Sequence, residues 1–120
     1  MKNLQLFFVV LVATEHIYFM ILEIFYWDKP SGLKAFGLTL EEAKITKVLA
    51  KNQGLYNGFL AAGLIWSLIK INNSLEIALF FLICVAIAGI YGAYTTKKIK
   101  IFYVQFIPAF IGIILTLLIK

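Results

Sequence analysis

The chain carries four apolar stretches, each long enough or nearly long enough to cross a lipid bilayer as a helix. They cover about residues 4–27, 53–71, 75–95 and 101–119. A helix needs about 20 apolar residues to span the ~30 Å of hydrocarbon in a bilayer. The stretches lack the two-residue alternation of strands, and 62% of the 120 residues are hydrophobic. We therefore predict an all-α membrane protein with four transmembrane helices in a single domain.

The connections between the stretches predict how the helices are arranged. Residues 72–74 and 96–100 make short links between successive stretches. Short links join antiparallel neighbours, which is typical of an up-down bundle. The first loop is longer, and it opens on the turn-forming residues 28–32, which must end the first helix.

An amphipathic helix is predicted in this first loop, at residues 40–51. Thr39 and Glu42 have the spacing of a capping box, in which each residue bonds the backbone N–H of the other. Lysines and aliphatic residues of the segment fall on different sides of a helix, as in helices that lie at the bilayer surface. The sequence equally allows the segment to continue the second spanning helix, with Gly54 as the natural place for a bend.

The lysines predict an orientation in the membrane. The chain has a net charge of +5, and it contains no arginine, which weighs against nucleic-acid recognition. Eight lysines lie in the first and third loops, and three lie on the other side. By the positive-inside rule, the first and third loops are expected in the cytoplasm and both termini outside. The lysines are expected to meet anionic headgroups of the lipid bilayer.

Small residues and a proline predict where helices approach closely or loosen. Gly54 and Gly58 share one face of the second stretch, and Gly89 lies on a small-residue stripe of the third. Such positions let two backbones come together in a membrane. In the fourth stretch Pro108 lacks a backbone N–H, so we expect a loosened helix near Val104.

Three ionisable residues lie within the first apolar stretch, namely Glu15, His16 and Glu23. Each costs roughly 2.5–3.5 kcal/mol at membrane depth on insertion scales, so such groups normally face a bundle interior and mark a functional site. The three fall within one sector of a helix, and we expect them to face other spans. Glu23 lies about one turn from Trp27, and we interpret it as a residue at the rim of the membrane.

The other stretches offer polar partners for this sector. Gln53 and Asn57 are one turn apart on the second stretch, with Tyr56 beside them, and Tyr91 and Gln105 come from the third and fourth. Amides can both donate and accept hydrogen bonds. The predicted ligand-binding site contains Glu15, His16, Gln53, Tyr56, Asn57, Tyr91, Glu23 and Gln105, with Glu15 and His16 at its centre.

Three classes of function fit such a cluster. The first is a protein that binds or moves a small or lipid-like molecule, alone or coupled to protonation of Glu15 or His16. The second is a membrane-embedded enzyme that uses Glu15 and His16 as an acid-base pair on a lipophilic substrate. The third is a structural or assembly subunit, and a homo-oligomer is compatible with all three. We expect neither a cofactor nor a metal ion, because one histidine and Cys84 form no haem or zinc ligand set.

Several runs of residues resemble a known family. They are Glu15-His16, Glu23 with Trp27, Asn52 to Gly63, Ala88 to Gly92, and Gln105 with Pro108-Ala109. These runs are similar to the small bacterial membrane proteins called domain of unknown function 1304, over nearly the whole chain. The resemblance implies a multi-pass protein of the bacterial inner membrane with four spans. It implies no activity.

Overall fold

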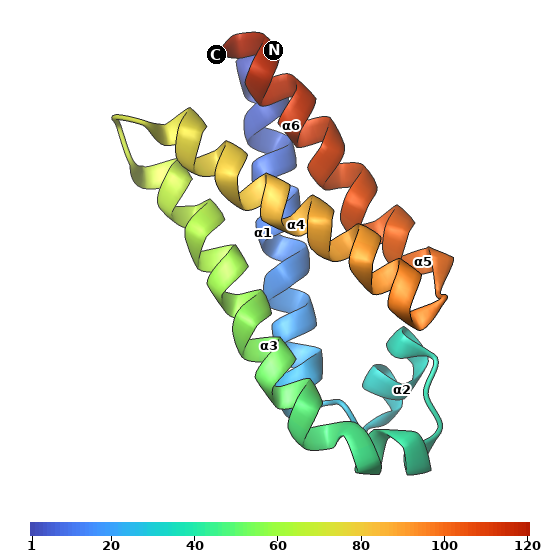
Figure 1. Cartoon of the computed structure of the whole chain (residues 1–120). Helices are drawn as coiled ribbons and strands as arrows, with labels where there is room; N and C mark the ends of the chain where they lie inside the picture. Colours follow the sequence, from blue (N-terminus) through green and yellow to red (C-terminus); the bar gives the residue numbers. More distant parts are fainter. The chain divides into compact units, whose positions relative to one another are not determined.

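The structure, a computed structural model, describes residues 1–120 and consists of helices joined by turns. The elements are α1 (Lys2–Phe25), α2 (Pro30–Phe36), α3 (Leu40–Ile69), α4 (Ser74–Thr96), α5 (Ile99–Ile101), the π-helical segment η1 (Phe102–Phe106) and α6 (Ile107–Ile119) (Figure 1). The prediction of an all-α protein is confirmed.

Three helical segments are long and apolar enough to cross a membrane. These are α1, α4 and the continuous run Ile99–Ile119, which joins α5, η1 and α6. Helix α3 has 30 residues, but its first half carries Glu41, Glu42, Lys44, Lys47 and Lys51. Length and composition therefore support three membrane-spanning helices, and the predicted fourth is not confirmed by them.

Helix α3 is continuous from Leu40 to Ile69 (Figure 1). Residues 40–51 thus belong to the same continuous helix as the second apolar stretch, which is not interrupted at Gly54. The placement of residues 40–51 at the bilayer surface stays a prediction. The capping box at its start is confirmed. The backbone N–H of Thr39 donates to Glu42 Oε1 at 2.9 Å, and that of Glu42 donates to Thr39 Oγ1 at 3.1 Å.

Helix α2 lies where the sequence analysis expected only a turn. Pro30 occupies its first turn, where the missing N–H of proline costs nothing because no helical partner exists there. Gly37 ends the helix with a φ of 63°, a left-handed conformation that glycine adopts without strain.

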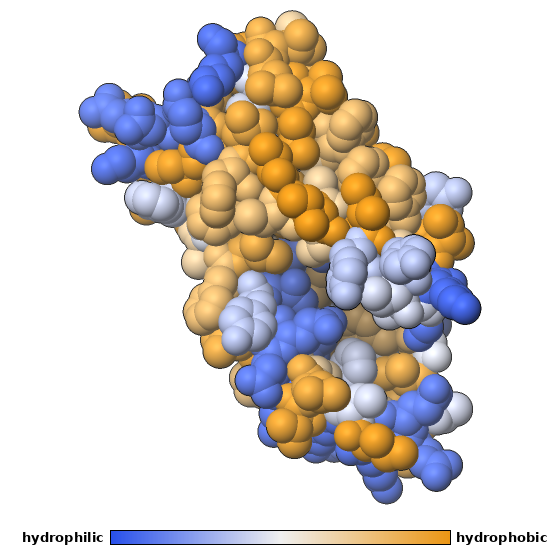
Figure 2. All heavy atoms as spheres, in the orientation of Figure 1, coloured by the Kyte–Doolittle hydropathy of each residue, from blue (hydrophilic) through white to orange (hydrophobic).

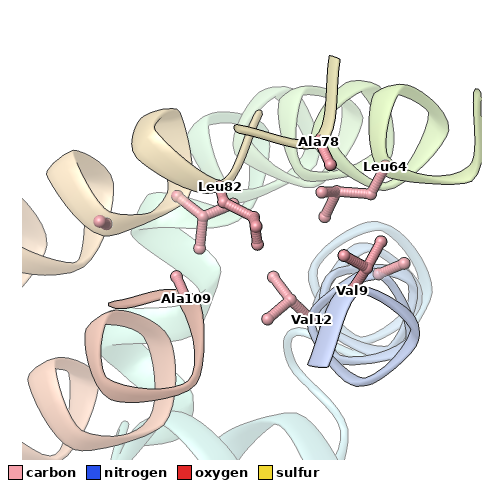
Figure 3. Packing of buried hydrophobic residues seen from close by; sticks show 9 residues of the cluster. Val9, Val12, Leu64, Ala78, Leu82 and Ala109 are labelled. Atoms are coloured by element: carbon pink, nitrogen blue, oxygen red, sulfur yellow. The ribbon is translucent and has the colours of Figure 1, made fainter. Parts of the chain in front are cut away.

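The residues form two compact units, which we describe separately. The first unit contains Met1–Thr14 and Leu60–Lys120, and the second contains Glu15–Phe59. The core of the first unit is built from small and branched apolar side chains of α1, α3, α4 and α6. In Figure 3 these include Val9, Val12, Leu64, Ala78, Leu82 and Ala109.

The outer surface of the first unit is apolar. Phe80 and Ile87 of α4 are each 61% exposed, and Leu118 of α6 is 63% exposed. In Figure 2 this part of the chain shows a broad apolar surface. An apolar core beneath an apolar surface is the pattern of helices surrounded by lipid.

Helix α4 and the backbone of segment η1 approach each other closely at Gly89. A Cβ built on Gly89 would lie 2.8 Å from the backbone nitrogen of Phe106. Segment η1 is wider than an α-helix. The N–H of Ile107 donates to the carbonyl of Phe102, five residues back, and we expected such a loosened turn before Pro108. The prediction of a loosened helix near Val104 is confirmed.

Replacing Gly89 by alanine is expected to destabilise the first unit by about 1–3 kcal/mol, the usual cost of overpacking. The added methyl would meet backbone atoms of η1, which cannot turn aside as a side chain can. Gly92→Ala on the same helix is the control, because the nearest atom to a Cβ there is Ile101 Cγ2 at 3.4 Å. Thermal unfolding of both variants in detergent should separate them, and equal unfolding temperatures would contradict the contact.

Candidate functional site

Glu23, in the last two turns of α1, is the most deeply buried acidic residue of the chain. Its side chain is 0% exposed. Gln53 Nε2 donates a hydrogen bond to Glu23 Oε2, and Asn57 Nδ2 donates one to Glu23 Oε1. Both carboxylate oxygens therefore accept an amide N–H from α3. We call these three residues the Glu23 site.

Helix α3 can supply both amides because Gln53 and Asn57 are one turn apart and lie on the same face. Gly54, between them in sequence, lets the helices approach. A Cβ built on it would lie 2.8 Å from Ile24 Cγ1, 3.1 Å from Glu23 Cβ and 3.2 Å from the carbonyl oxygen of Met20. The chain is therefore closely packed around the carboxylate.

The three side chains of the Glu23 site differ in their exposure to the surroundings. Gln53 is exposed and Asn57 is partly buried, whereas Glu23 is enclosed. No ion pair is formed by Glu23, since the two salt bridges of the structure join Lys47 to Asp28 and Lys120 to Glu76. The carboxylate is held by neutral amides, of which Gln53 is the exposed one.

Glu23 is enclosed by the protein in the structure, and its interpretation as a residue at the rim of the membrane stays a prediction. The amides that were expected beside Glu15 and His16 bond Glu23 instead. The centre of the candidate site therefore moves about two turns along α1, from Glu15 to Glu23.

Glu15 and His16 lie in the same helix, in a different environment. His16 is 0% exposed, and its ring stands edge-on to that of Phe19 with the centroids 5.4 Å apart. Glu15 is partly buried, and its Oε2 is buried without a hydrogen-bond partner. Glu15 thus remains a candidate for contact with a ligand.

The remaining predicted site residues make none of the hydrogen bonds of the Glu23 site. Tyr56 of α3 is 62% exposed and Tyr91 of α4 is 68% exposed, whereas Gln105 of η1 is partly buried. Tyr91 and Gln105 belong to the first unit, whereas the Glu23 site lies wholly in the second. The residues that the structure brings together are therefore Glu23, Gln53 and Asn57.

Beyond the end of α1, Trp27 and Asp28 make polar and aromatic contacts with α2 and α3. Trp27 Nε1 donates a hydrogen bond of 3.0 Å to Thr46 Oγ1, and the Trp27 ring lies 4.9 Å from that of Phe36 on α2. Lys47 Nζ donates a hydrogen bond of 3.0 Å to Asp28 Oδ2. These contacts join the link that follows α1 to α2 and to the first turns of α3 within the second unit.

Because of the ion pair between Asp28 and Lys47, we expect the free energy of unfolding to decrease at acidic pH. The hydrogen bond from Lys47 holds the pKa of the Asp28 carboxyl below its usual value, and the charge of the ammonium acts in the same direction. A lowered folded-state pKa contributes stability that is present above the unfolded pKa, about 4, and is lost as the pH falls through the folded pKa. Lys47→Met should remove this contribution.

Thermal unfolding from about pH 7 down to about pH 3 checks this expectation. Lys47→Met should be less stable than the wild type at neutral pH, and the difference should shrink in acid. Lys44→Met is the matched control, because Lys44 is exposed on the same helix and forms no salt bridge. A difference between Lys47→Met and wild type that stays constant with pH would contradict the ion pair.

The protein is all-helical, and its three helices of membrane-spanning length and apolar composition are consistent with the membrane class. The chain belongs to the family described as protein of unknown function (DUF1304), whose model matches residues 10–117. It is 35% identical over 100 residues to the uncharacterized protein YpaA of Lactococcus lactis subsp. lactis strain IL1403, covering 82% of this chain and 84% of that protein. No solved structure matches it.

Proposed function

We propose that the chain crosses the membrane four times, with α3 as the additional span over about residues 53–71. The C-terminal part of α3 is apolar, and its charged residues all precede Gln53. The first half also has an aliphatic face, because Ile45, Val48 and Leu49 are 77%, 72% and 71% exposed. Lipid contact would cover these side chains. Together with the lysine distribution, this supports cytoplasmic first and third loops and both termini outside.

We propose that this membrane protein binds or moves a small or lipid-like molecule at the Glu23 site, coupled to proton exchange at the carboxyl group. The observation that carries the proposal is that both oxygens of the enclosed Glu23 carboxylate accept hydrogen bonds from neutral amides. An ionised carboxylate needs two donors, and a protonated one needs an acceptor for its O–H. An amide provides either by rotating its end, so the site is suited to both states.

The exposure of Gln53, which bonds the enclosed carboxylate, supports a binding role. Gln53 is the exposed member of the site, so rotation of this one side chain would uncover Glu23 Oε2 without moving a helix. A ligand amine or hydroxyl could then take the place of the amide as the donor. Tyr56, exposed on the same helix, offers a ring and a hydroxyl to an arriving lipid headgroup.

Infrared spectroscopy of the protein in lipid vesicles tests the proton exchange. Titration between about pH 4 and about pH 9, a range that includes the ordinary carboxyl and imidazole values, should show a protonated-carboxyl C=O band that is absent from Glu23→Gln. Glu15→Gln is the matched control, since it removes the other carboxyl of α1. Native mass spectrometry after incubation with a total polar lipid extract should then show a lipid retained by the wild type and lost from Glu23→Gln.

The enzyme hypothesis is favoured by a different observation, the buried and unpartnered Oε2 of Glu15 next to the buried His16. In that case, purified protein should convert a component of the lipid extract, and Glu15→Gln or His16→Asn should abolish conversion while Glu23→Gln keeps it. If Glu23→Gln neither changes the infrared band nor lowers lipid retention, the Glu23 site has a structural role only.

A further inference from the structure

A small cavity in the first unit contains an unusual combination of polar groups. Its volume is about 20 Å³. Gln5 of α1, Ser67 of α3 and Ser74 of α4 line it together with Lys2 and five apolar residues. Gln5 is only 2% exposed, and its Oε1 is buried without a hydrogen-bond partner. A buried amide oxygen without a hydrogen-bond donor costs free energy. A ligand in the cavity that donates a hydrogen bond to this oxygen would therefore be stabilised.

The other contact of the Gln5 amide favours the orientation in which Oε1 lacks a donor. Thr116 Oγ1 donates its single proton to the carbonyl of Gly112 at 2.7 Å, and it accepts from Gln5 Nε2 at 3.0 Å. Rotating the amide to satisfy Oε1 would require the Thr116 hydroxyl to give up its bond to Gly112.

Ser67 is the second polar group available at the cavity. It is 5% exposed, and its hydroxyl proton is used in a bond of 2.6 Å to the carbonyl of Leu64. Its oxygen lone pairs can still accept. The cavity thus presents two acceptors, Gln5 Oε1 and Ser67 Oγ, to whatever occupies it.

We propose that this cavity binds one water molecule, which donates its two protons to Gln5 Oε1 and Ser67 Oγ. A cavity of about 10–15 Å³ is enough for one water, and two to four polar partners hold it in place. The site takes a water because the volume leaves no space for a headgroup or a phosphate. The water would bridge Gln5 of α1 and Ser67 of α3 by hydrogen bonds, while the amide nitrogen of Gln5 bonds Thr116 of α6. This inference uses residues of the first unit alone and is independent of the Glu23 site.

Lys2 is the competing donor, because it also lines the cavity and its ammonium could reach Gln5 Oε1. Lys2→Met separates the two arrangements. With a bound water, Lys2→Met keeps the wild-type unfolding temperature, whereas Gln5→Leu and Ser67→Ala both lower it. With a lysine partner, Lys2→Met lowers the unfolding temperature as Gln5→Leu does, and Ser67→Ala has little effect.

Nuclear magnetic resonance of the whole protein in detergent micelles supplies a direct readout. A cross-peak between water and the side-chain amide of Gln5 is expected in the wild type and in Lys2→Met, with the sign of a long-lived bound water. The peak should be lost in Ser67→Ala, which removes one of the two acceptors. Its absence from the wild type, or its persistence unchanged in Ser67→Ala, would overturn the proposal.

Discussion

Glu23→Ala is expected to destabilise the protein by about 2–5 kcal/mol. The substitution removes the acceptor of two amide donors, Gln53 Nε2 and Asn57 Nδ2, and each hydrogen bond lost costs about 0.5–1.5 kcal/mol. It also leaves a void beside Gly54, where the backbones are close. The free energy of unfolding, measured in detergent by circular dichroism, should show the loss.

Matched variants distinguish the hydrogen bonds from the volume of the side chain. Glu23→Gln keeps the shape, and rotation of one partner amide restores both hydrogen bonds, so its cost should stay below about 1 kcal/mol. Replacing Glu23, Gln53 and Asn57 together by leucine removes donors and acceptor at once and should recover much of the stability lost in Glu23→Ala. Glu41→Ala, at an exposed position of α3, should be close to neutral. If Glu23→Ala unfolds as the wild type does, the site contributes nothing to stability.

The Glu23 site shows what the sequence can and cannot predict. The cost of an acidic residue in an apolar stretch identifies Glu15, His16 and Glu23 as special, and the spacing of Gln53 and Asn57 identifies a polar face. Which acid these amides meet depends on how far α1 and α3 are shifted along each other. That shift is set by packing at Gly54 and Gly58 against Met20, and periodicity within one helix carries no information about it.

Helix α3 illustrates a second limit. Its capping box at Thr39 could be recognised from two residues, because a cap is a local structure. Whether the helix continues through Gly54 could not, since glycine lowers helix propensity by only about 1 kcal/mol and tertiary contacts decide. Helix α2 was missed for a related reason, because Pro30 fits both a turn and the first position of a helix.

Gly54→Leu is expected to disrupt the second unit and to cost about 3 kcal/mol or more. Even a Cβ at this position would lie within 3.2 Å of the carbonyl oxygen of Met20, and a backbone atom of a helix cannot move aside alone. Helix α3 would therefore have to separate from α1 near Glu23, which would break the hydrogen bonds from Gln53 and Asn57. Gly54→Ala should cause a smaller loss of about 1 kcal/mol, because overpacking by one methyl is partly offset by better helix propensity.

Asn52→Leu is the matched control, since it adds the same side chain two residues earlier at an exposed position. The amide of Asn52 bonds only the carbonyl of Val48 in its own helix, so its loss should leave the unfolding temperature nearly unchanged. Combining Gly54→Leu with Glu23→Ala gives the decisive comparison. If Gly54→Leu acts by separating the helices at the Glu23 site, the double variant should be much less destabilised than the sum of the single effects, because the same hydrogen bonds cannot be lost twice. Additive effects would show that Gly54 and Glu23 stabilise the protein independently.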